Sequence, residues 1–173
     1  MCIRDSNRAM LDETDRQIIS YLQYDGRMPY TKIANELGIT EGGIRRRVKK
    51  MTEEGVLQIV GIVQPHDIGL DEASMNGVTI EGRPIDEVAE EIANHSEVTY
   101  LFQAAGEVDL FVEVYCQDRE HFVDFLNNTL QRIPGVRATQ SFLRLKMYKL
   151  SYRWGDAPPP KQAGKKPSLP LVE

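Results

Sequence analysis

The spacing of apolar residues changes once along this chain, and the change divides it into two parts. From Leu11 to Gly55 apolar positions recur every three or four residues, as on one face of a helix. From Val56 onward short β-branched and alternating stretches appear, which favour strands. A chain of 173 residues is long enough for two small domains with their own cores. We therefore expect a helical first domain and a second domain built on a sheet.

Three short helices are predicted in the first part. The first ends at Gly26, and the second runs from Tyr30 to Leu37 and stops at Gly38. Thr40 is a good N-cap for the third helix, which ends at Gly55. Two helices joined by a turn of a few residues that contains Gly are typical of a helix-turn-helix.

The second part has the pattern of a linker strand followed by a β-α-β-β-α-β order. The linker strand is predicted over Val56 to Val63. The later strands are expected at about 73–80, 98–105, 109–116 and 136–152, with helices opened by Pro84 and Asp118. This order is ferredoxin-like. The predicted fold class is α+β: a winged-helix-like helix-turn-helix domain joined by a strand linker to a ferredoxin-like βαββαβ domain.

The predicted domain boundaries follow from these patterns. Residues 1–9 form an extension without expected structure, 10–55 the helix-turn-helix domain, 56–70 the linker and 71–154 the ferredoxin-like domain. Residues 155–173 are rich in proline and poor in large apolar residues, so we expect a disordered tail.

Charge is distributed unevenly between the two parts. The whole chain carries −5, but residues 1–55 carry +1 and residues 56–154 carry −7. Five of the six residues from Arg45 to Lys50 are basic, so the positive charge is concentrated on the third helix. A basic third helix behind a glycine-containing turn is the geometry of a recognition helix in the major groove of DNA.

Several classes of protein are disfavoured by the sequence. No apolar run approaches the roughly 20 residues that span a bilayer, and no signal peptide is apparent, so we expect a cytoplasmic protein without membrane contact. Two distant cysteines and three scattered histidines offer no metal site, cofactor site or catalytic set. We therefore expect no enzyme activity and no cofactor.

The order and spacing of short motifs indicate a family. The motifs are Leu11-Asp12-x-x-Asp15-x-x-Ile18, Asp25-Gly26-Arg27, Ile33-Ala34, Gly38-Ile39-Thr40, Arg47-Val48, Glu54-Gly55-Val56-Leu57, Gly106-x-x-Asp109 and Pro134-Gly135-Val136-x-x-Thr139-x-Ser141. Together they resemble the leucine-responsive regulator/AsnC family of bacterial and archaeal transcription factors. The resemblance covers about Leu11 to Tyr152 and implies a DNA-binding regulator with a second domain, called RAM, that binds an effector and assembles subunits.

The third helix supplies the expected contacts with double-stranded DNA. Its N-terminal residues should lie nearest the base edges or the sugar-phosphate edge, and its flanking cations should hold phosphates. The first group is Thr40, Glu41, Gly42, Gly43 and Arg46, and the second is Arg45, Lys49 and Lys50. Arg47 precedes the partly buried Val48, so a structural role and a DNA contact are both open for it.

The resemblance also implies an effector site in the second domain. Members of the family bind a small effector, often an amino acid, at subunit contacts near the loop that contains Gly106 and Asp109. The hydroxyls of Thr139 and Ser141 would come from a neighbouring subunit. Ala105 and Val108 stand where a hydroxyl residue and an aromatic residue are common in the family. Assembly into a homodimer or a larger homo-oligomer is expected, through the RAM sheet and the linker strand.

Two other functions fit parts of the sequence. The β-α-β-β-α-β order is also that of RNA-recognition modules, and the stretch from Asp109 to Tyr115 contains two aromatic residues. The −7 charge of that half opposes a phosphate backbone. A metabolite sensor or enzyme of the same fold is the third hypothesis. The basic helix-turn-helix argues against a sensor alone, and the lack of a catalytic set argues against an enzyme.

Overall fold

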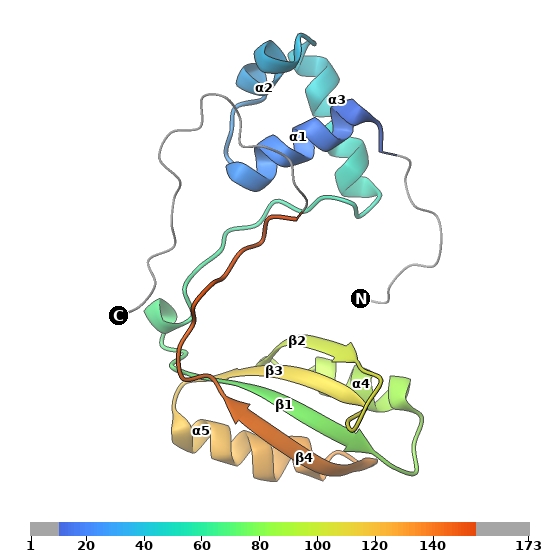
Figure 1. The fold of residues 1–173 in the computed structure, drawn as a ribbon, viewed down its shortest axis with the longest axis vertical. Coiled ribbons are helices and arrows are strands. Elements are labelled where there is room, and N and C mark those ends of the chain that lie inside the picture. The colour runs from blue at the N-terminus through green and yellow to red at the C-terminus, as the bar shows by residue number, and fades with distance from the viewer. Residues whose placement is uncertain (1–10, 155–173) are drawn as a thin grey trace. The chain divides into compact units, whose positions relative to one another are not determined.

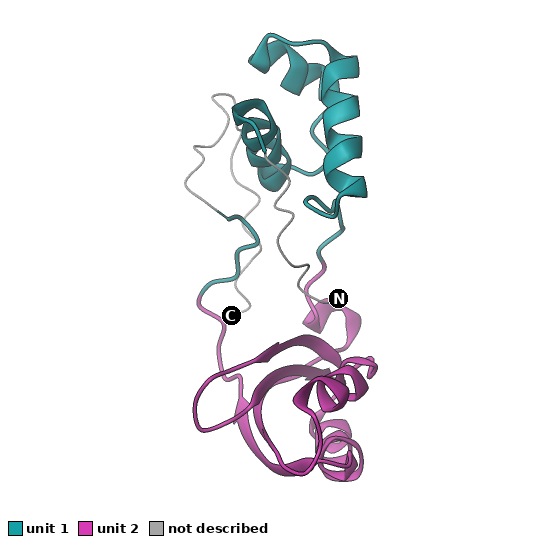
Figure 2. Cartoon of the chain, turned by 90° about the vertical axis from the view of Figure 1, so that its right-hand side faces the viewer, with its two compact units in different colours: residues 1–62, 149–170 teal, residues 63–148, 171–173 magenta. Residues whose placement is uncertain are grey.

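The computed structural model describes residues 11–154, which form two compact units (Figures 1 and 2). The described part of the first unit contains residues 11–62 and 149–154, and the second contains residues 63–148. The predicted extension, 1–9, and the predicted disordered tail, 155–173, lie outside the described residues. The predicted linker is divided between the two units at Ile62.

The first unit contains the three predicted helices: α1 (Glu13–Tyr24), α2 (Tyr30–Leu37) and α3 (Glu41–Glu53). Asp12 caps α1 in a capping box with Asp15, and Thr40 caps α3. Gly38 ends α2 with a φ of 66°, a conformation that glycine adopts at little cost. The three helices share one apolar core, whose most buried side chains are Ile18, Ile33, Ile44 and Met51.

The second unit is a four-stranded antiparallel sheet in the order β2-β3-β1-β4. Along the chain come β1 (Glu72–Ile80), α4 (Ile85–Ala93), β2 (Val98–Gln103), β3 (Leu110–Cys116), α5 (Arg119–Asp124) and β4 (Val136–Leu143). A π-helical turn and a short 3-10 helix extend α5 to Arg132, and another 3-10 turn covers His66–Ile68. The predicted β-α-β-β-α-β order is therefore confirmed.

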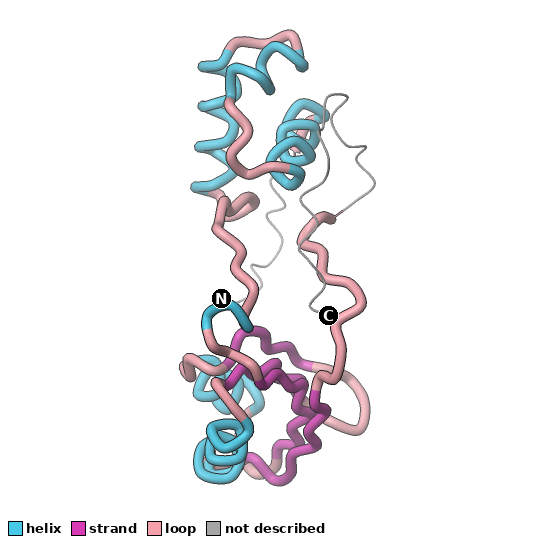
Figure 3. Tube along the Cα trace, turned by 90° about the vertical axis from the view of Figure 1, so that its left-hand side faces the viewer, coloured by secondary structure: helices cyan, strands magenta, loops and turns pink. Residues whose placement is uncertain are grey.

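The sheet has one covered face and one open face. On the covered face, Val78, Val112 and Val114 are buried together with Val88 and Ile92 of α4. Figure 3 shows the two helices of this unit, α4 and α5, on this side of the strands. The open face carries five aromatic side chains, in part exposed: Tyr100, Phe102, Phe111, Tyr115 and Phe142.

Two strand predictions need correction. The linker over Val56 to Val63 forms no strand, and the last strand ends at Leu143 instead of continuing to about Tyr152. Both segments are drawn as loops in Figure 3. Their residues have strand-like composition, but a strand also needs a neighbouring backbone to accept and donate hydrogen bonds. Within the described chain neither segment has such a neighbour.

None of the helices between residues 11 and 154 combines the length and the apolar character needed to cross a membrane.

Candidate functional site

The recognition-helix candidate, α3, has one buried and one exposed face. Ile44, Val48 and Met51 are buried in the core of the first unit, which fixes the rotation of the helix about its axis. The spacing of these three positions leaves the basic side chains on the remaining faces. The exposed basic residues are Arg45, Arg46, Lys49 and Lys50.

The first turn of α3 is held by its cap and is open toward solvent. The Thr40 hydroxyl accepts a hydrogen bond from the Gly43 backbone N–H at 3.1 Å. A Cβ atom added at Gly42 would meet no atom within 4 Å. The missing side chain at Gly42 therefore leaves free space above the backbone, where another molecule can approach closely.

Most cations of α3 already face an acidic partner one turn away. Arg45 pairs with Glu41 at 2.6 Å, while Lys49 lies 3.6 Å from Glu53 and Lys50 lies 3.8 Å from Glu54. Such exposed pairs contribute only about 0.3–0.5 kcal/mol each, so a phosphate can displace them at small cost. Among the described residues, Arg46 has no ion-pair partner and is exposed.

Arg47 makes a structural contact between α3 and α1. Its guanidinium donates hydrogen bonds to Asp12 Oδ2 at 2.7 Å and to Asp15 Oδ1 at 2.8 Å. Hydrogen bonds to Asp15 and Asp12 raise the pKa of Arg47. Hydrogen bonds from the Asp15 backbone and from Arg47 lower the pKa of Asp12. Of the two roles open to Arg47, the geometry supports the structural one.

Replacing Arg47 with alanine is expected to lower the melting temperature of the first unit at neutral pH. The pKa of Asp12 is lower in the folded state than its unfolded value of about 4. The stability that ionised Asp12 contributes is therefore fully present above the unfolded value and is lost as the pH falls through the folded pKa. The variant should therefore show a weaker loss of stability on acidification. Circular dichroism melts between about pH 3 and pH 7 measure this. Arg45→Ala, which removes the pair with Glu41 and the contact with the Tyr30 ring but no partner of Asp12, should keep the acid dependence of the parent chain.

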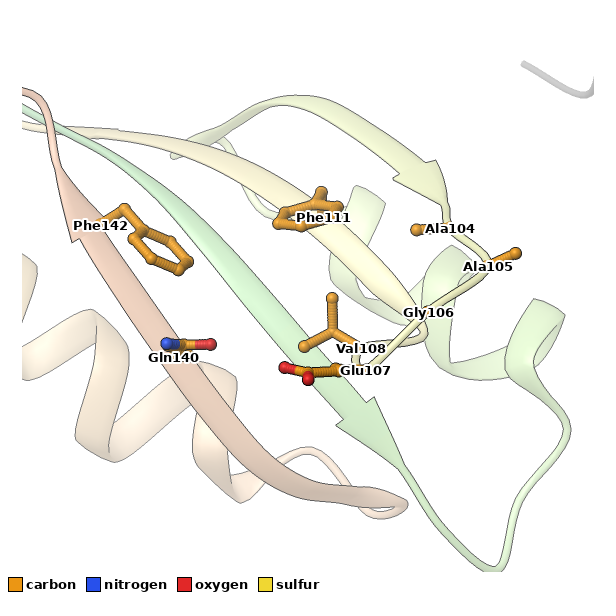
Figure 4. Close-up of a pocket in the computed structure, with 8 residues that line it drawn as sticks. All are labelled: Ala104, Ala105, Gly106, Glu107, Val108, Phe111, Gln140 and Phe142. Atoms are coloured by element: carbon orange, nitrogen blue, oxygen red, sulfur yellow. The ribbon is translucent and has the colours of Figure 1, made fainter.

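A pocket of about 440 Å³ lies on the open face of the sheet in the second unit (Figure 4). Its lining consists of Ala104, Ala105, Gly106, Glu107, Val108, Phe111, Gln140 and Phe142. Val108 lies over Gly77 of β1, where an added Cβ would come within 3.0 Å of the Val108 side chain. The pocket therefore combines apolar walls from two aromatic rings with one carboxylate and one amide.

The four predicted effector residues do not all face this pocket. Gly106 lines it, but the Asp109 carboxylate accepts a hydrogen bond from the Ile80 backbone N–H at 2.7 Å, which fastens the loop to β1. Thr139 and Ser141 pair with Val78 and Asn76, so they share the covered face of the sheet.

The neighbours of these hydroxyl residues along β4, Gln140 and Phe142, reach the pocket instead. Thr139 is engaged elsewhere, because its hydroxyl accepts a hydrogen bond from Gln131 at 2.7 Å. Strand alternation alone predicts that Gln140 and Phe142 lie on the same face of the strand. Which of the two faces is open depends on how the helices cover the sheet, and no sequence motif indicated it.

Comparison with known proteins identifies both units. Residues 11–52 match the AsnC-type helix-turn-helix domain, and residues 75–154 match the Lrp/AsnC ligand binding domain. A helix-turn-helix transcriptional regulator of Pyrococcus furiosus is 34% identical over 83% of this chain and 97% of its own length. The regulator FL11 of Pyrococcus abyssi is 32% identical over 82% of this chain and 94% of its own length.

Solved structures agree with these sequence matches. A transcriptional regulator from Neisseria meningitidis, crystallised in complex with L-Met, has a TM-score of 0.76 and 25% identity, covering 84% of this chain and 96% of its own. Escherichia coli AsnC shares the fold with a TM-score of 0.74 and 24% identity, over 82% of this chain and 96% of its own.

The fold and the exposed basic helix thus define a DNA-binding transcriptional regulator, and members of this class are not enzymes. The chain belongs to the Lrp/AsnC family.

Proposed function

We propose that α3 enters the major groove of its operator with its first turn facing the bases. The observation that carries this proposal is the open N-terminal turn of α3 beside the unpaired Arg46. The base-facing group would comprise Thr40, Glu41, Gly42, Gly43 and Arg46, and the phosphate-holding group Arg45, Lys49 and Lys50. Arg47 stays with α1 and keeps α3 at a fixed angle to it.

The phosphate-holding group is tested by salt dependence. In Arg45→Ala/Lys49→Ala, affinity should fall for every duplex, and the slope of log affinity against log salt should flatten by about 0.9 per lost contact. Fluorescence anisotropy with duplex DNA measures both quantities, and single-stranded RNA serves as the competing ligand. A matched control is Arg119→Ala/Arg137→Ala, which removes two exposed cations from the second unit. An unchanged slope in the α3 variant would contradict the assignment.

We further propose that the chain acts as a homodimer or larger homo-oligomer in the cytoplasm, where its DNA would be. The open sheet face and the extended linker both lack partners within the described chain. A second copy would cover the aromatic face and give the linker a strand to pair with. Two copies would present two recognition helices about 34 Å apart, as a pseudo-palindromic site requires.

An amino acid or similar small molecule is the proposed effector, and the pocket beside Gly106 is its proposed site. Glu107 would face the ammonium group, Gln140 the carboxylate, and the rings of Phe111 and Phe142 an apolar side chain. The Neisseria regulator was crystallised with L-Met, a ligand of this chemistry. In this proposal Asp109 holds the loop in place, and Thr139 and Ser141 would reach the ligand only from a neighbouring subunit.

Thermal shift with each of the twenty amino acids tests the pocket. At least one with an apolar side chain should raise the melting temperature, and Gln140→Ala should abolish that shift because the amide is lost from the lining. Gln17→Ala, a glutamine of the first unit, is the matched control and should keep the shift. No stabilisation by any amino acid, or an undiminished shift in Gln140→Ala, would remove the effector role from this pocket.

A further inference from the structure

The helix-turn-helix part of this chain carries no net charge. Residues 11–62 contain eight acidic and eight basic residues, which cancel. The strongest basic cluster, on α3, is largely paired with carboxylates of the same unit. Because phosphate attraction supplies most non-specific DNA affinity, a neutral DNA-binding domain lacks its usual long-range source of attraction.

Within the described residues, the net positive charge of the first unit comes from a segment near the C-terminal end of the chain. Residues 149–154 belong to this unit and contain Lys149 and Arg153 without any acidic residue. We define the basic arm as residues 149–154, which hold two basic residues and no acidic one. With the arm, the described part of this unit has a net charge of +2.

The arm is attached to the C-terminal end of α1. The Trp154 backbone N–H donates a hydrogen bond to Gln23 Oε1 at 2.9 Å. The Arg153 guanidinium lies 5.6 Å from the centre of the Tyr24 ring. The last turn of α1 contains no basic residue, so Arg153 brings a cation to the negative end of the helix dipole.

The cations of the arm are available to an outside ligand. Among the described residues, Lys149 and Arg153 have no acidic partner within ion-pair distance. In the second unit, four of the six basic residues lie within ion-pair distance of a glutamate: Arg83, Arg119, Arg137 and Arg144. Lys149 is exposed, and the neighbouring Trp154 is 78% exposed although it is large and apolar.

We propose that the basic arm is a second DNA-contact element, in which Lys149 and Arg153 hold backbone phosphates outside the bases that α3 reads. This inference rests on the DNA binding proposed for α3. In extended backbone the four residue steps from Lys149 to Arg153 span about 13 Å, so the two cations can reach two different phosphates. The contacts are to phosphates only, so they add affinity without adding sequence preference.

The test uses the full chain carrying Lys149→Ala/Arg153→Ala. The slope of log affinity against log salt should flatten by up to about 1.8, because about 0.9 is lost per phosphate contact. Affinity should fall by the same factor for the operator and for a random duplex, so their ratio stays constant. Arg119→Ala/Arg137→Ala removes the same charge from the second unit and should leave the slope nearly unchanged.

The possible results distinguish DNA contact by the arm from DNA contact by α3 and from a role of the arm in assembly. If the arm variant keeps the parent slope, the arm proposal is wrong, whatever the α3 variants do. If α3 variants also leave binding intact, the DNA site itself is misplaced. Sedimentation of each variant without DNA measures a second role: dissociation into monomers by the arm variant, with an unchanged salt slope, would show that the arm docks on another copy of the chain and would overturn the proposal.

Discussion

Placing aspartate at both Phe102 and Phe111 is expected to convert the proposed dimer into monomers. The two rings stack on the open sheet face with centroids 5.4 Å apart, and Tyr100 lies 5.5 Å from Phe102. In a two-fold dimer each substitution occurs twice, so four buried rings are lost. At about 1.5 kcal/mol or more for each ring, the dimer loses at least about 6 kcal/mol, equivalent to a dissociation constant about ten-thousandfold higher.

Analytical ultracentrifugation over a range of concentrations measures this change. Val123→Asp is the control, because Val123 is exposed on α5, the helix that covers the other face of the sheet. It should leave the dimer intact. Circular dichroism confirms that the double variant is folded. A folded double variant that remains dimeric would show that the open face is not the contact surface.

Loss of the Arg46 side chain is expected to have the second-largest effect. A guanidinium that contacts a base through two hydrogen bonds contributes about 1–3 kcal/mol of discrimination. With one such contact in each half-site, the loss is about 2–6 kcal/mol, so Arg46→Ala should reduce operator affinity by about 30- to 10⁴-fold and random-duplex affinity much less. Arg46 has no ion-pair partner in the described chain, so the substitution should leave the melting temperature nearly unchanged.

Two substitutions at Thr40 distinguish a base contact of this residue from its role as the cap of α3. Thr40→Ala loses the hydroxyl that accepts the Gly43 N–H, which costs about 0.5–2 kcal/mol of stability. Thr40→Ser keeps this cap. If Thr40→Ser restores stability but not operator preference, the Thr40 methyl contacts the DNA. Equal operator preference in the alanine variant and the parent would remove Thr40 from the base-facing group.

The helices and the strand order were predictable because local chemistry determines them. Asp12 and Thr40 are caps in the structure, and Gly38 takes the left-handed conformation that ends α2. Apolar spacing correctly predicted the β-α-β-β-α-β order. The prediction of a strand in the linker was wrong. Strand-like composition is a local property of the sequence, whereas the neighbouring strand that the linker lacks would have to come from elsewhere.

Residue roles that depend on long-range contacts were harder to predict. Arg47 lies in a basic run, but its partners on α1 are 32 and 35 residues away. Asp109 bonds the backbone of Ile80, 29 residues away. The contact between Trp154 and Gln23 spans 131 residues, and no spacing rule links them. The sequence indicated the loop at Gly106, whereas sheet register decides that Gln140 reaches the pocket from β4.

Selection of bound sequences from a pool of random duplexes tests most directly whether α3 reads DNA. With the full chain, DNA reading by α3 predicts enrichment of a pseudo-palindrome whose two half-sites lie about 10 base pairs apart, one helical turn of DNA. With Arg46→Ala, the enriched pool should lose preference at a symmetric pair of positions and keep the same spacing. The absence of enrichment with the parent chain, or an identical enriched sequence with Arg46→Ala, would show that α3 does not read the DNA sequence.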